Sequence, residues 1–276
     1  MNAIEVKNLT KKFDRFTLDN ISFELPSGFI LGLIGENGAG KSTTINSLLG
    51  VISYEGDIKI FGQPVSPELK NRIGVVLDDV GFPGTFTAKD VNLVMKNTFK
   101  QWDEKAFFNY LSKFSLPEKQ KFSEFSKGMK MKLQIAAAIS HNAELLILDE
   151  PTSGLDPLVR DEIIDILNDF TRDDNHSILI SSLIVSDLEK LCDYIAFIHK
   201  GKLILCEEKD MLLDQYVFIN TTEEQLAELD ASAVKGKKSS KWGTEAIVDR
   251  SLIPSSFETK PITIEDLFVF MAKEEK

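Results

Sequence analysis

The stretch "FILGLIGENGAGKS" (residues 29–42) decides the fold. Its first half is a continuous apolar run that ends in glycine, as expected of a strand buried on both faces of a parallel sheet. Its second half (residues 35–42) has the spacing G-x-x-x-x-G-K-S, and a helix is expected to follow and to end at Gly50. Glycines let the backbone curl so that several N–H groups point inward, and the helix start adds its positive end. The stretch therefore predicts a cradle for phosphate groups.

The residue types in this loop match the P-loop motif of nucleotide-binding proteins. Lys41 is placed to reach the β- and γ-phosphates, and the Ser42 hydroxyl is placed to hold Mg²⁺. A chance glycine-rich turn is disfavoured, because the motif lies between a buried strand and a helix. The predicted contacts to the nucleotide are Gly35, Glu36, Asn37, Gly38, Ala39, Gly40, Lys41, Ser42 and Thr43.

A second polar motif follows another apolar run. In "LLILDEP" (residues 145–151), four apolar residues precede Asp149 and Glu150, so both carboxylates are expected at the end of a buried strand. There Asp149 can hold the Mg²⁺ ion, and Glu150 can orient or deprotonate an attacking water. Combined with the phosphate cradle, the pair predicts a nucleotide hydrolase.

The order of elements indicates an α/β fold. Residues 4–25 alternate and turn like antiparallel strands, and residues 72–79 read as a buried strand. After an all-helical insert at about 80–140, the pattern resumes with a strand at 177–182 and a hairpin turning near residues 200–201. Strands that alternate with helices imply a mainly parallel sheet covered on both faces. The clearest apolar stripes on single helix faces are Phe107, Tyr110, Leu111, Phe114 and Ile163, Ile166, Leu167, Phe170.

The pattern weakens beyond about residue 210. We predict a nucleotide-binding domain over residues 1–212 and a small α/β appendage over residues 213–276. Within the appendage, the expected strands are "YVFIN" (216–220) and "TEAIVDR" (244–250), the expected helices are "EEQLAEL" (223–229) and "IEDLFVFMAK" (264–273), and the expected turn or hairpin tip is "KGKKSSKWG" (235–243).

The composition bounds the class of protein. The chain has 276 residues, 43% hydrophobic and 27% charged, as in soluble globular proteins. Its net charge of −11 argues against a protein that mainly binds nucleic acid, which needs a basic face. Cys192 and Cys206 are too few for a disulfide framework or a zinc site, so we expect two reduced thiols. With no secretion signal and no run of about 18 apolar residues, we expect a cytoplasmic chain that reaches a membrane only through a partner.

The segment "EFSKGMKMKLQIAAAI" (124–139) followed by "LLILDEPTSGLDP" (145–157) gives the chain its resemblance to ATP-binding cassette (ABC) ATPases, which covers about residues 2–220. Ser126 and Gly128 stand where the family's signature has its serine and a glycine, whereas Lys127 and Met129 depart from it. "SGLD" (153–156) matches the D-loop. The resemblance implies a P-loop NTPase with a RecA-like core, an antiparallel β subdomain and an inserted helical subdomain. The aromatic expected to stack on adenine is Phe13, with Phe16 as its nearby competitor.

The resemblance also implies ATP as the nucleotide and a mechanism that needs two chains. Cassettes of this family pair head to tail, so Ser126, Lys127 and Gly128 would act on the nucleotide of a second cassette, identical or paralogous. Closure moves the helical subdomain, which pulls on a membrane permease. ATP drives this change because it binds the closed dimer better than the open one.

Asp78 is one departure from the family pattern. It lies in "VVLDDVGFPGTFT" (75–87), where a glutamine that reaches Mg²⁺ and the attacking water usually stands. Aspartate is shorter and charged but can still hold metal-bound water, so Asp78 is a candidate metal-binding and catalytic residue. The alternative is that Asp78 simply ends its strand. Residues 78–82 are the expected contact with a cytoplasmic helix of the permease.

Leu183 is a second departure. It lies in "SILISSLIVSDLEKL" (177–191), where the family usually has a histidine that touches the reacting phosphate. Leucine cannot donate a hydrogen bond, and the loss of one such donor typically costs ~10²–10³ in rate. The only histidines, His141, His176 and His199, are not placed by sequence to replace it. An engineered substitution that traps ATP, a natural inactive half of a heterodimer and a tolerated natural leucine all remain open; the intact motifs elsewhere favour the first.

Together these features predict the nucleotide-binding subunit of a bacterial ABC exporter, peripheral at the cytoplasmic face of the membrane. It would bind and hydrolyse ATP to drive a separate permease. The short insert and small tail resemble subunits that export drugs, antibiotic peptides or toxin peptides. The alternatives are a soluble ABC ATPase that acts on DNA or ribosomes, disfavoured by the single cassette and acidic balance, and an importer subunit.

Overall fold

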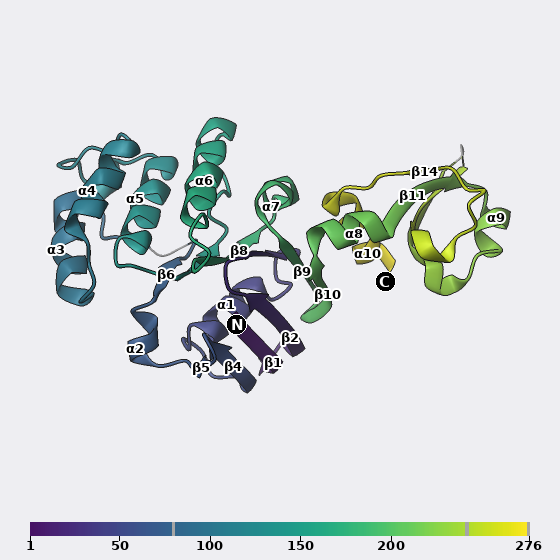
Figure 1. Cartoon of the computed structure of the whole chain (residues 1–276), viewed down its shortest axis with the longest axis horizontal. Helices are drawn as coiled ribbons and strands as arrows, with labels where there is room; N and C mark the ends of the chain where they lie inside the picture. The colour runs from purple at the N-terminus through teal and green to yellow at the C-terminus, as the bar shows by residue number, and fades with distance from the viewer. Residues whose placement is uncertain (79–80, 241–242, 275–276) are drawn as a thin grey trace.

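The computed structural model describes residues 1–78, 81–240 and 243–274, and a six-stranded sheet forms its centre (Figure 1). The strands of this sheet are β3 (Ile30–Ile34), β6 (Ile73–Val76), β7 (Leu145–Asp149), β8 (Ser177–Ser182), β9 (Tyr194–His199) and β10 (Lys202–Glu208). Their order is β10-β9-β3-β8-β7-β6, and all neighbours are parallel except β9 and β10. The mainly parallel sheet and the hairpin at residues 200–201 are therefore confirmed.

The strands bury alternate side chains in two apolar clusters. Along β7, Leu146 and Leu148 enter one cluster, and Leu145 and Ile147 enter the other. Since successive side chains of a strand point to opposite faces, both faces of the sheet are covered. β3, β7 and β8 are buried over their whole length, as expected of central strands of a parallel sheet.

Helices cover the sheet, and their apolar stripes explain their positions. These helices are α1 (Lys41–Leu48), α6 (Pro157–Phe170) and α7 (Val185–Leu191). α1 packs in the cluster that holds Leu145, and α6 and α7 pack in the cluster that holds Leu146. The predicted stripe of α6 is confirmed at Ile163, Ile166 and Leu167, which are buried, while Phe170 is half-buried.

An antiparallel sheet lies beside this core, as the alternation at the start of the chain predicts (Figure 1). Its strands are β1 (Asn2–Lys12), β2 (Thr17–Pro26), β4 (Glu55–Ile60) and β5 (Gln63–Pro64), in the order β2-β1-β4-β5. The short helix α2 (Pro67–Lys70) then leads to β6.

The insert before β7 is helical, as predicted. It contains α3 (Ala88–Thr98), α4 (Glu104–Lys113), the 3₁₀ turn η1 (Phe122–Glu124) and α5 (Lys127–Ile139). Phe107, Leu111 and Phe114 of its predicted stripe are buried, and Tyr110 is half-buried. None of the helices in the described parts of the chain has the length and apolarity needed to cross a membrane.

The appendage follows helix α8 (Lys209–Gln215) and contains an antiparallel sheet of its own. The sheet has the order β12-β13-β11-β14. In chain order, the strands of this sheet and the helices between and after them are β11 (Tyr216–Thr221), α9 (Glu223–Ala227), η2 (Ala231–Ala233), β12 (Val234–Ser240), β13 (Gly243–Asp249), η3 (Arg250–Leu252), β14 (Thr259–Lys260) and α10 (Ile264–Glu274). The two predicted strands and two predicted helices are confirmed.

The polar stretch at 235–243 is predicted to be a turn or a hairpin tip, and the hairpin is confirmed, since Ser240 pairs with Gly243. Most of it belongs to β12, which pairs with β13 from Val234↔Val248 to Ser240↔Gly243. Cross-strand pairing with an apolar strand overrides the weak local β-propensity of lysine, glycine and serine. Residues 241–242 lie outside the described residues.

Helix α10 returns to the core. The Phe268 ring packs edge-on against Phe197 of β9, with ring centroids 4.8 Å apart, and Leu267 and Phe270 are buried in the same cluster as α6 and α7. The appendage is therefore tied to the sheet by apolar contact as well as by the chain. The division of the chain near residue 212 falls within α8 and stays a prediction.

Candidate functional site at the carboxyl edge of the sheet

Strand register brings the predicted motifs to one edge of the sheet. Ile34 of β3 pairs with Ser182 of β8, and Asp149 of β7 pairs with Ser181 of β8. The loop after β3, the carboxylates after β7 and the segment after β8 therefore begin side by side. Ligands of open parallel sheets bind at this edge.

The loop that follows β3 owes its shape to glycine. Gly38 and Gly40 have φ angles of 80° and 121°, in the left-handed region that disfavours side chains. A Cβ atom on Gly35 would lie 2.4 Å from the Ile198 carbonyl oxygen, so the loop lies directly against β9. Gly40 is the N-cap residue of α1, and no side chain forms a capping hydrogen bond with the first turn of that helix. This arrangement suits an anion at the helix start.

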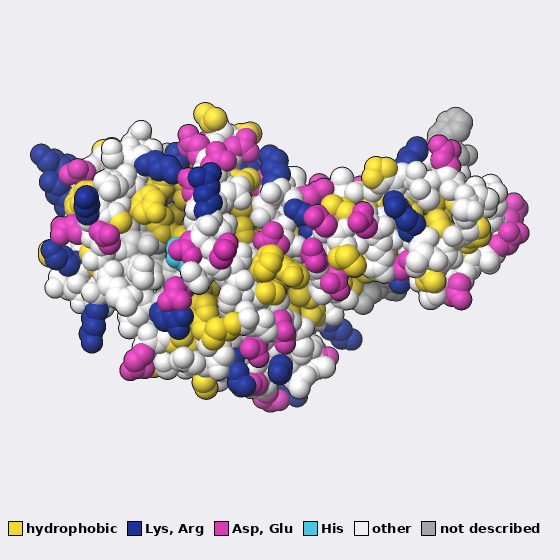
Figure 2. All heavy atoms as spheres, in the orientation of Figure 1, with side chains coloured by type: hydrophobic (Ala, Val, Ile, Leu, Met, Phe, Trp, Pro, Cys, Tyr) yellow, Lys and Arg dark blue, Asp and Glu magenta, His cyan; other side chains and the backbone are white. Residues whose placement is uncertain are grey.

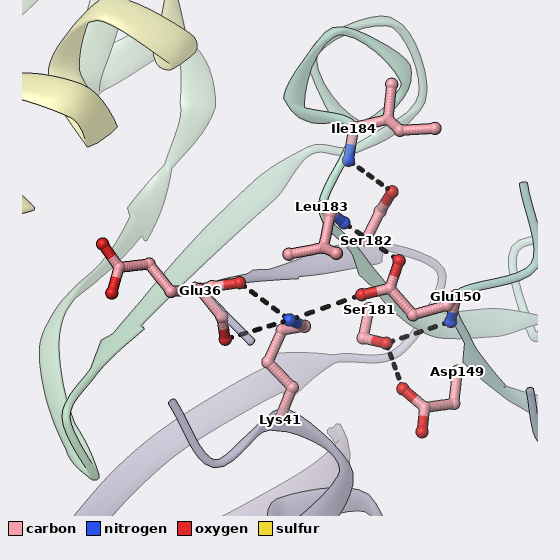
Figure 3. Close-up of polar contacts among 9 residues, drawn as sticks. Glu36, Lys41, Asp149, Glu150, Ser181, Ser182, Leu183 and Ile184 are labelled. Atoms are coloured by element: carbon pink, nitrogen blue, oxygen red, sulfur yellow. Dashed lines mark hydrogen bonds and ion pairs between the residues drawn. The ribbon is translucent and has the colours of Figure 1, made fainter. Parts of the chain in front are cut away.

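Lys41 joins the loop to the carboxylate pair. Its Nζ atom donates to the carbonyl oxygens of Gly35 (2.7 Å) and Glu36 (3.4 Å) and forms an ion pair with Glu150 Oε1 at 3.3 Å. Figure 3 shows these three acceptors converging on the ammonium group. The Lys41 side chain is 6% exposed, so its charge is held at the loop.

Hydrogen bonds from the last part of β8 and from the residue that follows it hold the two carboxylates (Figure 3). The Ser181 hydroxyl donates to Asp149 Oδ1 at 2.5 Å, and the Leu183 backbone N–H donates to Glu150 Oε2 at 3.0 Å. Glu150 has a φ of 53°, a conformation that is uncommon for a residue other than glycine. Such strained residues concentrate at functional sites.

A cavity of 690 Å³ opens at this edge. Ser42, Asp78 and Asp149 all line it, so the structure brings the three predicted metal-binding side chains to one space. Oxygen donors of this kind suit Mg²⁺, which proteins usually hold through one or two carboxylates plus substrate phosphates. The lining residues are Arg15, Phe16, Glu36, Asn37, Gly38, Gly40, Lys41, Ser42, Thr43, Asn46, Leu77, Asp78, Asp149 and Glu150.

The aromatic residues near the cavity differ in position. Phe16 lines the cavity, whereas Phe13 is 48% exposed and lies outside the lining, with its ring centroid 6.3 Å from that of Phe16. The structure thus places the competitor nearer than the residue first predicted to stack on adenine. Sequence reasoning did not identify Arg15 and Asn46, which carry no motif signal of their own.

The three histidines occupy different surroundings. His176 stacks on Phe170, and His141 stacks on Phe99 with its ring nitrogens near two backbone carbonyl groups. Burial lowers the pKa of His141. His199 lies at the end of β9 with Nδ1 3.9 Å from Glu36 Oε2, so it is closer to the loop than its position in the hairpin indicated.

The predicted signature segment lies outside the cavity. The Ser126 hydroxyl caps α5 by accepting from the Met129 N–H at 3.2 Å. A Cβ atom on Gly128 would lie 2.6 Å from Val159 Cγ1, so this glycine permits close contact with α6. Ser126, Lys127 and Gly128 are absent from the residues that line the cavity within the described parts of the chain.

A buried strand, a glycine loop, a helix and a neighbouring pair of carboxylates define the P-loop NTPase class. Within that class, the model of the ABC transporter family matches residues 18–153. The chain belongs to the ABC transporter family and is one of its ATP-binding ATPase subunits.

Curated relatives and a solved structure support this assignment. The chain is 38% identical to the bacitracin transport ATP-binding protein BcrA of Bacillus licheniformis, over 73% of this chain and 68% of that protein. It is 36% identical to the lantibiotic transport ATP-binding protein SrtF of Streptococcus pyogenes, over 75% of this chain and 91% of that protein. A solved ATP-binding subunit of an ABC transporter superposes with a TM-score of 0.69 and 27% identity, over 77% of this chain and 92% of that one.

Proposed function

We propose that this chain is the nucleotide-binding subunit of a bacterial ABC exporter, which hydrolyses ATP at the cytoplasmic face of the membrane to drive a separate permease. The observation that carries the proposal is the cavity that joins the P-loop to Asp78, Asp149 and Glu150. Relatives whose names specify bacitracin and lantibiotic transport support a peptide or drug as the exported substrate.

The roles of the cavity residues follow from their chemistry. The loop N–H groups and Lys41 bind the phosphates of ATP, and Glu150 orients or deprotonates the attacking water. Ser42, Asp149 and Asp78 would hold Mg²⁺, which would neutralise charge on the β- and γ-phosphates. Phe16 or Phe13 stacks on adenine.

A Glu150→Gln variant tests this assignment. It should bind ATP with an affinity close to that of the unmodified chain, because the phosphate contacts remain, and its hydrolysis rate should fall by ~10²-fold or more. Binding is measured by calorimetry and hydrolysis by phosphate release. A variant that hydrolyses ATP at the original rate would remove Glu150 from the mechanism.

The position of the signature segment supports head-to-tail pairing of two cassettes. Ser126 is exposed and lies outside its own chain's cavity, as a group that serves a second chain would. We expect the isolated chain to be monomeric or weakly dimeric and to pair firmly only with the permease. Cysteines introduced at Asn37 in one copy and at Ser126 in the other should cross-link in the full complex when ATP is present. Equal cross-linking with and without ATP would contradict ATP-driven closure.

A separate groove supports the proposed contact with the permease. It has a volume of 570 Å³ and lies where β6 meets α3 and α5. Leu77 lines both the groove and the ATP cavity, so a helix seated in the groove would be next to the nucleotide site. The apolar side chains of the lining include Leu49, Val51, Ile73, Val75, Val76, Phe82, Met95 and Phe99.

Cross-linking tests this docking site. A cysteine at Phe82 should cross-link to a cytoplasmic helix of the permease, whereas a cysteine at the exposed Leu252 in the appendage should not. Reaction at Leu252 without reaction at Phe82 would move the interface away from the groove. Asp79 and Val80, which belong to the predicted contact segment, lie outside the described residues.

Leu183 supports a slow chemical step. Its backbone N–H holds Glu150, but its side chain is 42% exposed and has no group that could donate to the γ-phosphate. We therefore propose that the chain binds ATP and closes, but is impaired in hydrolysis. The origin of the leucine does not affect this proposal.

A further inference from the structure

Ser181 contacts the carboxylate of Asp149 and the backbone N–H of Glu150 without lining the cavity itself. Its hydroxyl donates to Asp149 Oδ1 at 2.5 Å and accepts from the Glu150 backbone N–H at 3.1 Å, and its carbonyl oxygen accepts from the same N–H at 3.1 Å. The residue is fully buried, so water does not compete for these hydrogen bonds. One side chain on β8 therefore links the last residue of β7 to the residue that follows it.

These contacts fix the orientation of the Asp149 carboxylate and the backbone conformation of Glu150. Asp149 is 6% exposed, and a buried carboxylate keeps its orientation only where donors hold it. Glu150 is in the left-handed region with φ 53°, which an ordinary strand end would not impose. The two hydrogen bonds that its N–H donates to Ser181 hold the backbone in that conformation.

The Glu150 side chain is then held at both of its oxygen atoms. Oε1 lies 3.3 Å from Lys41 Nζ, and Oε2 accepts from the Leu183 N–H at 3.0 Å. The contact from residue 183 is made by the backbone, so it does not depend on which side chain stands there. The end of β8 thus positions Glu150 even though its side chain at 183 is leucine.

We propose that Ser181 is a positioning residue for ATP hydrolysis, which aligns Asp149 and Glu150 through its hydroxyl group. This inference rests on the proposed roles of these two carboxylates. Outer contacts of this kind typically change activity or metal affinity by 10- to 100-fold when removed. Within the described parts of the chain, Ser181 forms no hydrogen bond with the phosphate loop or with Lys41, so its loss should leave the binding of metal-free ATP unchanged.

The experiment compares Ser181→Val with Ser181→Thr. The two variants have nearly the same shape, and only threonine keeps the hydroxyl, so the comparison separates hydrogen bonding from packing. Ser177→Ala is the matched control, because Ser177 is a fully buried serine at the other end of β8 whose hydroxyl accepts from the Gly28 N–H. Thermal unfolding establishes that each variant is folded, and ATP hydrolysis is followed in single turnover so that a slow rate remains measurable.

Ser181→Val should lower the hydrolysis rate by about 10- to 100-fold with an unchanged affinity for metal-free ATP, and should weaken the dependence of ATP affinity on added Mg²⁺. Ser181→Thr should keep the hydrolysis rate within about threefold of that of the unmodified chain, a much smaller change than the loss predicted for Ser181→Val. Equal rates for the valine and threonine variants would overturn the proposal. That result together with a slow Glu150→Gln variant would leave the proposed function standing, whereas an unchanged Glu150→Gln rate would reject the role of Glu150 itself.

Discussion

The carboxyl edge of the central sheet and the C-terminal appendage are held together by different interactions. At the edge, polar groups from three strand ends bond one another over long sequence distances, as Lys41 does with Glu150 and Ser181 with Asp149. In the appendage, the small core is apolar, and polar contacts such as the ion pair of Glu223 with Lys237 join exposed side chains, whereas Lys41 and Glu150 are largely buried. On the face drawn in Figure 2, acidic and basic side chains are interspersed over the main body of the chain and over the appendage.

This difference predicts how each region responds to substitution. The chemistry is proposed to depend on a few polar groups at the edge, so changes there should alter binding or rate more than stability. Apolar contact attaches the appendage, so changes there should alter stability more than chemistry. The two regions meet at β9, where Phe197 contacts α10 and His199 lies near the phosphate loop. Substitutions in the appendage and at the carboxyl edge therefore test whether the two regions act independently.

The largest effect is expected for Lys41→Ala, which removes the ammonium group placed to contact the β- and γ-phosphates. Tight ATP binding should be lost, while the thermal unfolding temperature changes little. Calorimetric titration with ATP measures the affinity. Lys190→Ala is the control, because Lys190 pairs with Asp161 on α6, away from the cavity lining. Equal affinities for the two variants would contradict the P-loop assignment.

Leu183→His should raise turnover by ~10²-fold or more, because it restores one donor to the reacting phosphate. Nucleotide affinity should change only modestly, since the loop and Lys41 provide most of the contacts. Steady-state ATP hydrolysis of each form, assembled with its permease, measures this effect. Met211→His, at a position 57% exposed and outside the cavity lining, is the control. If the leucine form is already as fast as the histidine form, Leu183 is no impairment.

Phe268→Ala tests the attachment of the appendage. Removal of the ring from Phe197 should lower the free energy of unfolding by about 2–4 kcal/mol, because a large apolar contact is lost. Leu252→Ala, at a position 48% exposed, should change it by less than about 0.5 kcal/mol. Urea unfolding measures both. ATP affinity should stay unchanged, and a marked loss in Phe268→Ala would show that the appendage acts on the phosphate loop through β9.

The smallest effect concerns His141 and pH. Burial lowers its pKa, so the folded chain resists a proton that the unfolded chain accepts below about pH 6.5. Stability should be complete above that pH and should decline as the pH falls, by at most about 1.4 kcal/mol per pH unit for one proton. His141→Gln should flatten this decline in urea unfolding at pH 5 to 7.5. An unchanged slope would assign the decline to other groups.

Much of the fold could be predicted because its signals are local. Apolar periodicity identified the buried strands and the stripe at Phe107, Leu111 and Phe114, and glycine spacing identified the phosphate loop. Prediction was poorer where pairing decides the structure, as in β12, whose lysines and serines adopt a strand because β13 lies beside them.

The sequence by itself determined which residues are proposed to carry the chemistry, because a P-loop and a carboxylate pair are defined by neighbours along the chain. Only the tertiary structure decided how those residues are held. Ser181 meets Asp149 across 32 positions, and Leu183 meets Glu150 across 33, because parallel register aligns the ends of β7 and β8. The pairing of β3 with β9 likewise brings His199 near Glu36, and the folded chain places Phe16, in the turn between β1 and β2, rather than Phe13 in the lining. Local propensity contains no information about such contacts, since each depends on which strand lies beside which.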